Sequence, residues 1–348
     1  LIYLLGIVSR WIIMSKIDYK AFIEDNFFIK SKEGQIVPFI FNEVQNLWYQ
    51  QLLDDYPEMQ GIRENDLKGR QFGISSVISG IFTVDFILSG LGSIQLVDSD
   101  IYSHKDSETT SHFNRVNMFL DSWMLKTQGK DYRLLNDRQE VPKLRSQFLK
   151  VDTTNLLVAK NGVQIQTQTA SAKVSGRGST KQNIHWSEVA FYPNTQIMSA
   201  ETLVTGAEEQ VPNGYGKIFR ESTGNLAGDY FALEYQKGKE GISDFKSRFL
   251  VWYLHKPYST IAPLDWTVPT YYHKLIEDNL ATVDQCYWHF NKTRGLTDKK
   301  RLREYPTYDT EAFLYGGSPF FDADSLLFYT QQVREPIKRS MYVQTLPV

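Results

Sequence analysis

The chain has 348 residues, of which 42% are hydrophobic, 22% charged and 14% aromatic. This is the composition of a globular protein with one large or two small domains, and it excludes a disordered chain. The formal net charge of −2 excludes a uniformly basic coat for nucleic acid but allows a local basic patch. The single cysteine, Cys286, excludes a disulfide framework within the chain and indicates a reducing compartment. Aromatic neighbours predict that Cys286 is buried rather than reactive.

The first 13 residues form a short apolar run that Arg10 interrupts. A membrane span needs ~20 apolar residues, and a secretory signal has a basic start and a small-residue cleavage site that this run does not show. We therefore interpret residues 1–13 as an upstream leader and Met14 as the native start. No association with a membrane is expected.

Two helices are predicted before residue 90. Residues 27–56 indicate a loop followed by an amphipathic helix, with Asn42 at the position of its cap. The apolar residues of this helix recur at helical spacing: Phe41, Val44, Leu47, Trp48 and Leu52. Residues 68–88 begin with glycines and continue as an unbroken apolar stretch, which predicts a loop that leads into a buried helix.

Short strands are predicted along the following 130 residues. Their ranges are 93–99, 156–159, 163–169, 184–191 and 217–221. The dipeptide Asn161-Gly162 predicts a hairpin between the second and third of them. Strands that alternate with helices and end in polar groups indicate an α/β sheet with a site at its edge. Closely spaced prolines place a boundary near residue 256, followed by a small accessory subdomain.

The loop at residues 68–76 contains the parts of a phosphate-binding site. Such a site needs glycines that let backbone N–H groups face the phosphates, a cation, and a hydroxyl for Mg²⁺, just before a helix. The loop residues are Lys68, Gly69, Arg70, Gln71, Phe72, Gly73, Ile74, Ser75 and Ser76. Ile74 stands where the common pattern has lysine, so Lys68 is the candidate cation. The alternative is a structural loop with a surface lysine and arginine.

Three further segments can carry phosphoryl-transfer chemistry. Glu188 follows a predicted strand and can orient an attacking water, although Ser187 stands where an Mg²⁺-binding acid is usual. Ser222, Thr223 and Gly224 follow another strand, where small hydroxyl residues can sense a terminal phosphate. Arg177 lies between two glycines and can supply a transition-state cation. Each segment, taken alone, is also compatible with a simple turn or a solvent-facing loop.

The order of these segments resembles the ATPase domain of bacteriophage large terminases. The resemblance spans roughly residues 27–322 and begins with a segment around Asn42 and Gln45 that looks like the family's adenine-recognising motif. It implies an α/β fold of the P-loop NTPase type (ASCE/RecA-like), with a mostly parallel sheet flanked by helices. Residues 14–255 would form the ATPase domain, including the adenine segment. Residues 256–348 would form a small C-terminal lid and linker subdomain that leads to a missing nuclease domain.

The resemblance also implies roles for individual residues. Gln45, with Asn42, would recognise adenine. Lys68 and the amides of residues 69–76 (Walker A) would hold the phosphates, and Arg70 would stabilise charge on the γ-phosphate. The roles that follow in the chain are Mg²⁺ binding by Ser75 and Glu188 (Walker B), water activation by Glu188, and coupling by Ser222, Thr223 and Gly224. Arg177 would act in trans on a neighbouring subunit, with Arg115 and Arg133 as alternatives.

The implied function is ATP hydrolysis that drives double-stranded DNA into a viral procapsid. The expected cofactors are ATP and Mg²⁺. The expected partners are DNA, the portal protein, the small terminase subunit and copies of this chain in a ring, with a monomer in isolation. The expected location is the host cytoplasm and, transiently, the portal vertex of the procapsid. A basic segment could contact DNA phosphates or form a solvated helix face: Lys292, Arg294, Lys299, Lys300, Arg301 and Arg303.

Other functions remain alternatives at this point. Large terminases usually continue into a nuclease domain, for which the residues before Val348 leave no room, so we expect a split gene or a truncated reading frame. A helicase or remodeller would need a second motor-like domain or further motifs. A catalytically dead module that binds portal or DNA is the alternative from another class. A nuclease is the weakest reading, because the tail shows no clustered acidic triad.

Overall fold

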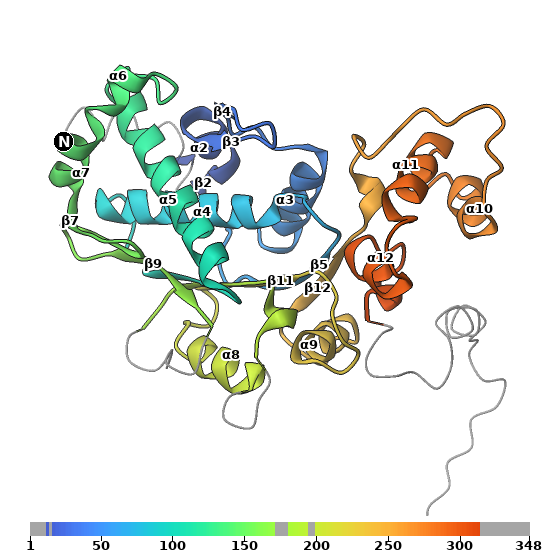
Figure 1. Ribbon diagram of the computed structural model, residues 1–348. Coiled ribbons are helices and arrows are strands. Elements are labelled where there is room, and N and C mark those ends of the chain that lie inside the picture. The colour runs from blue at the N-terminus through green and yellow to red at the C-terminus, as the bar shows by residue number, and fades with distance from the viewer. Residues whose placement is uncertain (1–11, 14–15, 171–179, 194–198, 314–348) are drawn as a thin grey trace, which may run out of the picture.

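An eight-stranded sheet forms the centre of the molecule (Figure 1). The computed structural model describes residues 12–13, 16–170, 180–193 and 199–313, so most of the predicted leader lies outside the described residues. The strand order is β12 (Lys246–Leu250), β5 (Arg63–Lys68), β11 (Lys217–Ser222), β10 (Asn183–Ser187), β6 (Ser99–Ser103), β9 (Gln164–Thr169), β8 (Leu156–Ala159) and β7 (Leu149–Asp152). From β12 to β9 the strands pair in parallel, and β8 and β7 continue the sheet antiparallel. The predicted α/β class is therefore confirmed.

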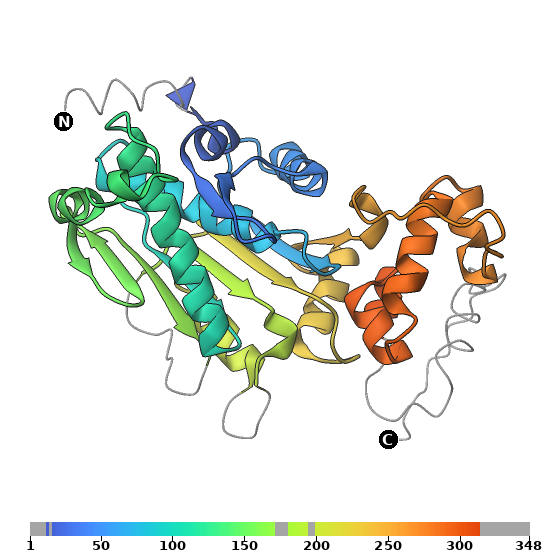
Figure 2. The same ribbon diagram turned by 45° about the horizontal axis from the view of Figure 1, so that its top comes forward.

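Helices cover both faces of this sheet (Figures 1 and 2). One face carries α4 (Ile74–Gly90) and α5 (Asp106–Lys126), with α2 (Tyr19–Asn26) packed on both, and α3 (Glu43–Asp55) beside them. The other face carries α8 (Ala200–Glu208) and α9 (Tyr230–Lys239). The shorter elements are β1 (Ile12–Ile13), β2 (Lys16–Ile17), β3 (Phe28–Lys30), β4 (Ile36–Pro38), α6 (Leu135–Arg138), α7 (Val141–Phe148) and η2 (Val189–Phe191).

Several predicted elements are confirmed. Asn42 caps α3 by accepting a hydrogen bond from the backbone N–H of Gln45, and the Gln45 side chain returns one to the Asn42 N–H. This reciprocal capping box fixes the start of the helix. The Asn161-Gly162 turn joins β8 and β9 as an antiparallel hairpin, and α4 is the predicted buried helix.

Other predictions are wrong at their boundaries. The strand expected at residues 93–99 begins only at Ser99, and the strand expected at 184–191 ends at Ser187. The part of residues 27–56 expected as a loop contains the β3–β4 hairpin. The long helix α5 was not predicted.

Strand β5 was also not predicted, because its sequence is polar while its position is central. Parallel strands are usually apolar since both faces are covered. Here the buried polar groups find partners instead: Glu64 pairs with Arg248 at 2.7 Å, and Asp66 accepts a 2.9 Å hydrogen bond from the Trp48 indole. Ion pairing and hydrogen bonding satisfy what apolar packing would otherwise supply.

Beyond strand β12 a group of short helices packs against the sheet edge (Figure 2). They are η3 (Trp252–Leu254), α10 (Thr270–Glu277), α11 (Val283–Thr293), α12 (Asp298–Glu304) and η4 (Asp309–Phe313). Stacked rings join them, with centroids 4.4 Å apart for Trp252 and His289 and 4.0 Å for Tyr258 and Trp288. Cys286 is fully buried among them, as predicted, and burial raises its thiol pKa to about 11.

The boundary predicted near residue 256 falls between η3 and α10 and stays a prediction. Within the described ranges, no helix is both long and apolar enough to span a bilayer.

Candidate active site

Three parallel strands end together and bring the predicted site residues to one edge of the sheet. Lys68 is the last residue of β5, and Glu188 directly follows β10. Ser187 of β10 is paired in register with Glu221 of β11. Side chains that follow parallel strands gather in this way because their carboxyl ends share an edge.

Glu221 is the centre of the cluster and was not among the predicted site residues. It is fully buried, and its Oε1 accepts hydrogen bonds from Ser75 Oγ at 2.6 Å and Ser187 Oγ at 2.7 Å. His185 Nε2 lies 3.3 Å from the same oxygen, and Lys68 Nζ lies 2.9 Å from Oε2. Burial alone would raise the pKa of Glu221, but the Lys68 ammonium and these hydrogen bonds hold it well below its usual range.

The Lys68 ammonium lies between two carboxylates. Its Nζ is 2.8 Å from Glu188 Oε1 as well as 2.9 Å from Glu221 Oε2. Burial would lower the pKa of Lys68, but the two negative charges outweigh that effect and raise it. Lys68 therefore stays charged, which is the state that a phosphate-binding lysine requires.

Glu188 stands in a strained backbone conformation. Its φ of 55° and ψ of 45° are left-handed, which costs a non-glycine residue ~1–2 kcal/mol. Its Oε2 accepts hydrogen bonds from the backbone N–H and the hydroxyl of Thr223, both at 3.2 Å, and from Ser222 Oγ at 3.4 Å. The predicted water-activating acid is thus bound directly to two of the predicted coupling residues.

The predicted phosphate loop presents unpaired backbone donors at the start of α4. Within the described part of the chain, the N–H groups of residues 71–75 have no hydrogen-bond acceptor, and no acidic residue occupies the first turn of the helix. Gln71 and Gly73 have φ angles of 64° and 74°, which turn the chain sharply here. A run of free N–H groups at a helix N-terminus is a ready anion site.

The predicted adenine-recognising residues hold this loop from one side. Asn42 Nδ2 donates to the Phe72 carbonyl at 3.2 Å, and Gln45 Nε2 donates to the Gly73 carbonyl at 3.0 Å. Both amides therefore contact the loop in the structure. Their role towards a base stays a prediction.

The remaining loop residues divide between the core and the surface. Ile74, in the place of the usual lysine, is fully buried in the hydrophobic core, and Ser76 is buried. Phe72 packs near the rings of His255 and Tyr258, and the Gly69 backbone approaches it closely. Ile74 therefore cannot contact a ligand, and the loop's only lysine is Lys68.

Arg70 lines a cavity of about 190 Å³ at the mouth of the cluster. The lining also includes Glu188, Thr223, Arg303 and Glu304. The Arg70 side chain is about half exposed, and its Nε lies 2.9 Å from Glu304 Oε2. A cation beside the predicted water-activating acid suits the role predicted for Arg70.

A buried histidine behind the site was missed by sequence reasoning. His112 Nε2 lies 3.2 Å from Ser187 Oγ, and its Nδ1 lies 3.1 Å from Arg115 Nη1. Burial and the Arg115 charge hold the pKa of His112 well below its usual value. The contact joins residues 75 positions apart, so only knowledge of the packing of α5 on β10 could have revealed it.

The three arginines considered for action in trans have different surroundings. Arg177 lies outside the described residues. Arg115 contacts His112 within its own molecule, and burial lowers its pKa to about 10. Arg133 pairs with Asp131 at the surface at 2.5 Å.

The basic segment is also divided. Lys292, Arg294, Lys299 and Lys300 are exposed. Arg301 lies over the Tyr271 ring, and Arg303 turns towards the cavity.

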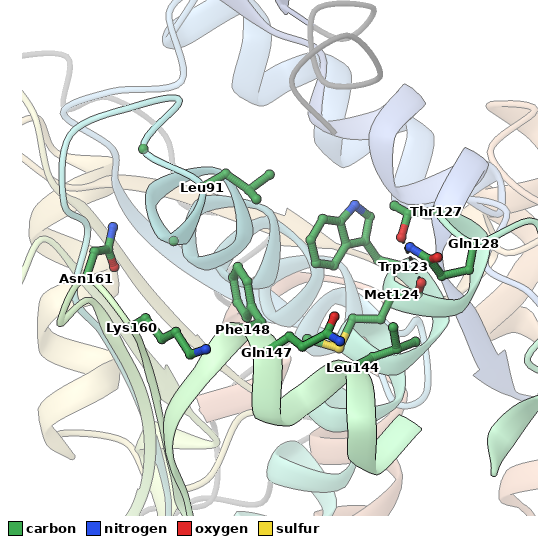
Figure 3. A pocket seen from close by; sticks show the side chains of 12 residues that line it. Leu91, Trp123, Met124, Thr127, Gln128, Leu144, Gln147, Phe148, Lys160 and Asn161 are labelled. Carbon is green, nitrogen blue, oxygen red and sulfur yellow. Dashed lines mark hydrogen bonds between the residues drawn. The ribbon is translucent and has the colours of Figure 1, made fainter. Parts of the chain in front are cut away.

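An apolar cavity of about 470 Å³ lies at the other end of α4 (Figure 3). Its walls include Leu91, Trp123, Leu144 and Phe148. Among the residues that the structure describes, Lys160 is the one charged residue in the lining, and no carboxylate is present there. Helix α4 is 17 residues long, so this cavity lies ~25 Å from the loop. The groups that can support chemistry gather at the loop end.

Comparison with solved structures finds large terminases of bacteriophages. The large terminase of bacteriophage HK97 matches with a TM-score of 0.50 and 15% sequence identity, over 89% of this chain and 57% of that one. The ATPase domain of the Thermus phage P74-26 large terminase matches with a TM-score of 0.41 and 15% identity, over 73% of this chain and 90% of that one. The chain thus has the fold of the HK97 large terminase while spanning about half its length. No protein-family model and no curated protein matches the sequence.

Proposed function

We propose that this chain hydrolyses ATP to drive double-stranded DNA into a procapsid, as the motor part of a terminase large subunit. The observation that carries the proposal is the cluster of Lys68, Glu221 and Glu188 beside a loop of free backbone N–H groups. The fold shared with the HK97 large terminase supports it.

The loop would bind the phosphates of ATP. An incoming phosphate would compete with Glu188 and Glu221 for the Lys68 ammonium, which now bridges them. Once Lys68 turns to the phosphate, Glu188 Oε1 becomes free to accept a proton or orient a water. Its Oε2 stays held by Thr223, so the carboxylate keeps its position while its partner changes.

The residues present fit Mg²⁺ through oxygen ligands. Ser75 Oγ, Ser187 Oγ and Glu221 form a compact set of hard donors, which is the chemistry that Mg²⁺ prefers. No cluster of three acidic, histidine or cysteine side chains able to hold a metal occurs among the described residues. Mg²⁺ would therefore be held mainly by phosphate oxygens and water, with Ser75 and Glu188 as predicted and Glu221 in addition. It would neutralise the charge that develops on the phosphates.

The partners belong to the same proposal. Double-stranded DNA, the portal protein, the small terminase subunit and further copies in a ring are those of a packaging motor, working in the host cytoplasm and at the portal vertex. The exposed cations Lys292, Arg294, Lys299 and Lys300 support a contact with phosphates that does not depend on sequence.

The test is ATP hydrolysis by the purified chain with Mg²⁺, with and without double-stranded DNA. Glu188→Ala is expected to abolish turnover, and Arg70→Ala is expected to lower it by ~10³-fold if it stabilises the transferring phosphate. Glu209→Ala, at an exposed acid that directly follows α8, is the matched control.

Stimulation by DNA would favour the motor over other ATPases. Binding of nucleotide without turnover would indicate that a neighbouring subunit is needed. The absence of both nucleotide binding and turnover would contradict the proposal and would favour a binding module. The replacements Ile74 and Ser187 are consistent with that alternative.

A further inference from the structure

Helix α12, in the C-terminal group of helices, reaches the cavity of about 190 Å³ that Arg70 and Glu188 line. Its last two residues, Arg303 and Glu304, line the cavity with Arg70, Glu188 and Thr223. The basic segment was expected to face DNA or solvent, so the position of Arg303 needs another account.

Glu304 holds the arginine of the phosphate loop. Its Oε2 lies 2.9 Å from Arg70 Nε, and its backbone carbonyl accepts a hydrogen bond from the Arg70 N–H at 3.1 Å. Its Oε1 also accepts a 3.3 Å hydrogen bond from Arg303 Nη2. One carboxylate, with its side chain 7% exposed, therefore joins two guanidinium groups at the cavity wall.

Arg303 retains unused donors. Its guanidinium lies over the Phe191 ring, 5.5 Å from the centroid, and its side chain as a whole is about one quarter exposed. Its Nε is buried and has no hydrogen-bond partner among the described residues. Since a guanidinium offers five N–H donors in a fixed fork, most of its capacity remains open to an anion.

We propose that Arg303 is a second, cis-acting arginine for the terminal phosphate of ATP, and that Glu304 occupies both arginines until that phosphate replaces it. The inference rests on the proposed function. The cavity is the γ-phosphate end of the site, because Glu188 and Thr223 line it while Gln45 holds the loop from elsewhere. Arg70 and Arg303 each reach the Glu304 carboxylate through a single nitrogen. A terminal phosphate has three oxygens and therefore offers acceptors to both guanidinium groups at once.

The experiment is calorimetric titration of the chain with ADP and with adenylyl imidodiphosphate, both with Mg²⁺. Arg303→Ala is expected to weaken the triphosphate analogue about 10- to 100-fold, the value of a hydrogen bond to a charged group, with ADP affinity kept within about twofold. Arg303→Lys should recover part of the loss. Glu304→Gln should strengthen the analogue alone, because the competing anion is removed.

Lys300→Ala is the control, since Lys300 is exposed on the same helix. The inference is overturned if Arg303→Ala leaves the analogue's affinity unchanged, or weakens both nucleotides alike as a folding defect would. It is also overturned if Glu304→Gln weakens the analogue. If the unmodified chain binds neither nucleotide, the proposed function itself has failed, which is seen before any variant is compared.

Discussion

His112 illustrates how a single buried side chain ties the site to the stability of the chain. It faces Ser79, Ser187, Arg115 and the His185 ring, and burial, followed by the Arg115 charge, lowers its pKa. The folded state therefore binds fewer protons than the unfolded state once the pH falls below about 6.5. Stability rises with pH in that window and is lost as the pH falls.

Replacing this histidine should flatten that dependence. In His112→Gln, the slope of the unfolding free energy against pH is expected to decrease by up to ~1.4 kcal/mol per pH unit between about pH 5 and 6.5. Urea denaturation at several pH values measures it. The exposed His273→Gln serves as control. An unchanged slope in His112→Gln would mean that the ring is charged in the folded chain.

The resemblance to the terminase ATPase domain predicted Lys68, Glu188, Ser222 and Thr223 as parts of one site, and the structure brings these side chains together. Glu221 was not predicted as a site residue, because only the pairing of β10 with β11 places it opposite Ser187. No spacing in the sequence encodes which strands are neighbours. The carboxylate that Ser187 contacts therefore comes from the neighbouring strand and not from the adjacent position in the chain.

At the scale of elements, the loop between β5 and α4 depends on one left-handed glycine. Gly73 has a φ of 74°, and a Cβ there would lie 2.5 Å from Gln45 Nε2. Gly73→Ala is expected to cost ~1–2 kcal/mol of stability and to displace Gln45, so nucleotide affinity should fall.

Gly92 supplies the comparison for this variant. It follows α4, has a φ of 71° and has open space around its Cβ position. Gly92→Ala should show a similar loss of stability by urea denaturation and no loss of nucleotide affinity by calorimetry. Equal affinities in the two variants would show that the loop does not bind nucleotide.

Among the elements, α3, α4 and the β8–β9 hairpin followed from periodicity, caps and turn residues, whereas β5 did not. Its polar residues are paired by Arg248 and Trp48, which lie far away in the sequence. A pattern of hydrophobicity cannot anticipate partners that only the folded chain supplies. Boundaries also shifted, as at Ser99 and Ser187, because backbone pairing rather than apolar content decides where a strand begins.

At the scale of the whole molecule, the C-terminal helices share the core of the sheet. Buried Trp252 stacks on His289 and donates to Thr307, and a continuous hydrophobic cluster extends from α4 to Tyr272 and Leu275. We expect a single unfolding transition in urea, coincident by far-ultraviolet circular dichroism and tryptophan fluorescence. Two separate transitions would contradict this and would favour independent units on either side of residue 256.

The backbone contact between Gly224 and Ala312 links the end of strand β11 to the C-terminal helices. A Cβ at Gly224 would strike the Ala312 carbonyl, so the two backbones lie in direct contact, while eight residues earlier Glu304 is fastened to Arg70. The two segments that are predicted to meet the nucleotide are therefore both held by residues 304–312. A movement at either contact is therefore transmitted to the other through residues 304–312. A flexible insertion between residues 304 and 312 is expected to uncouple the two movements.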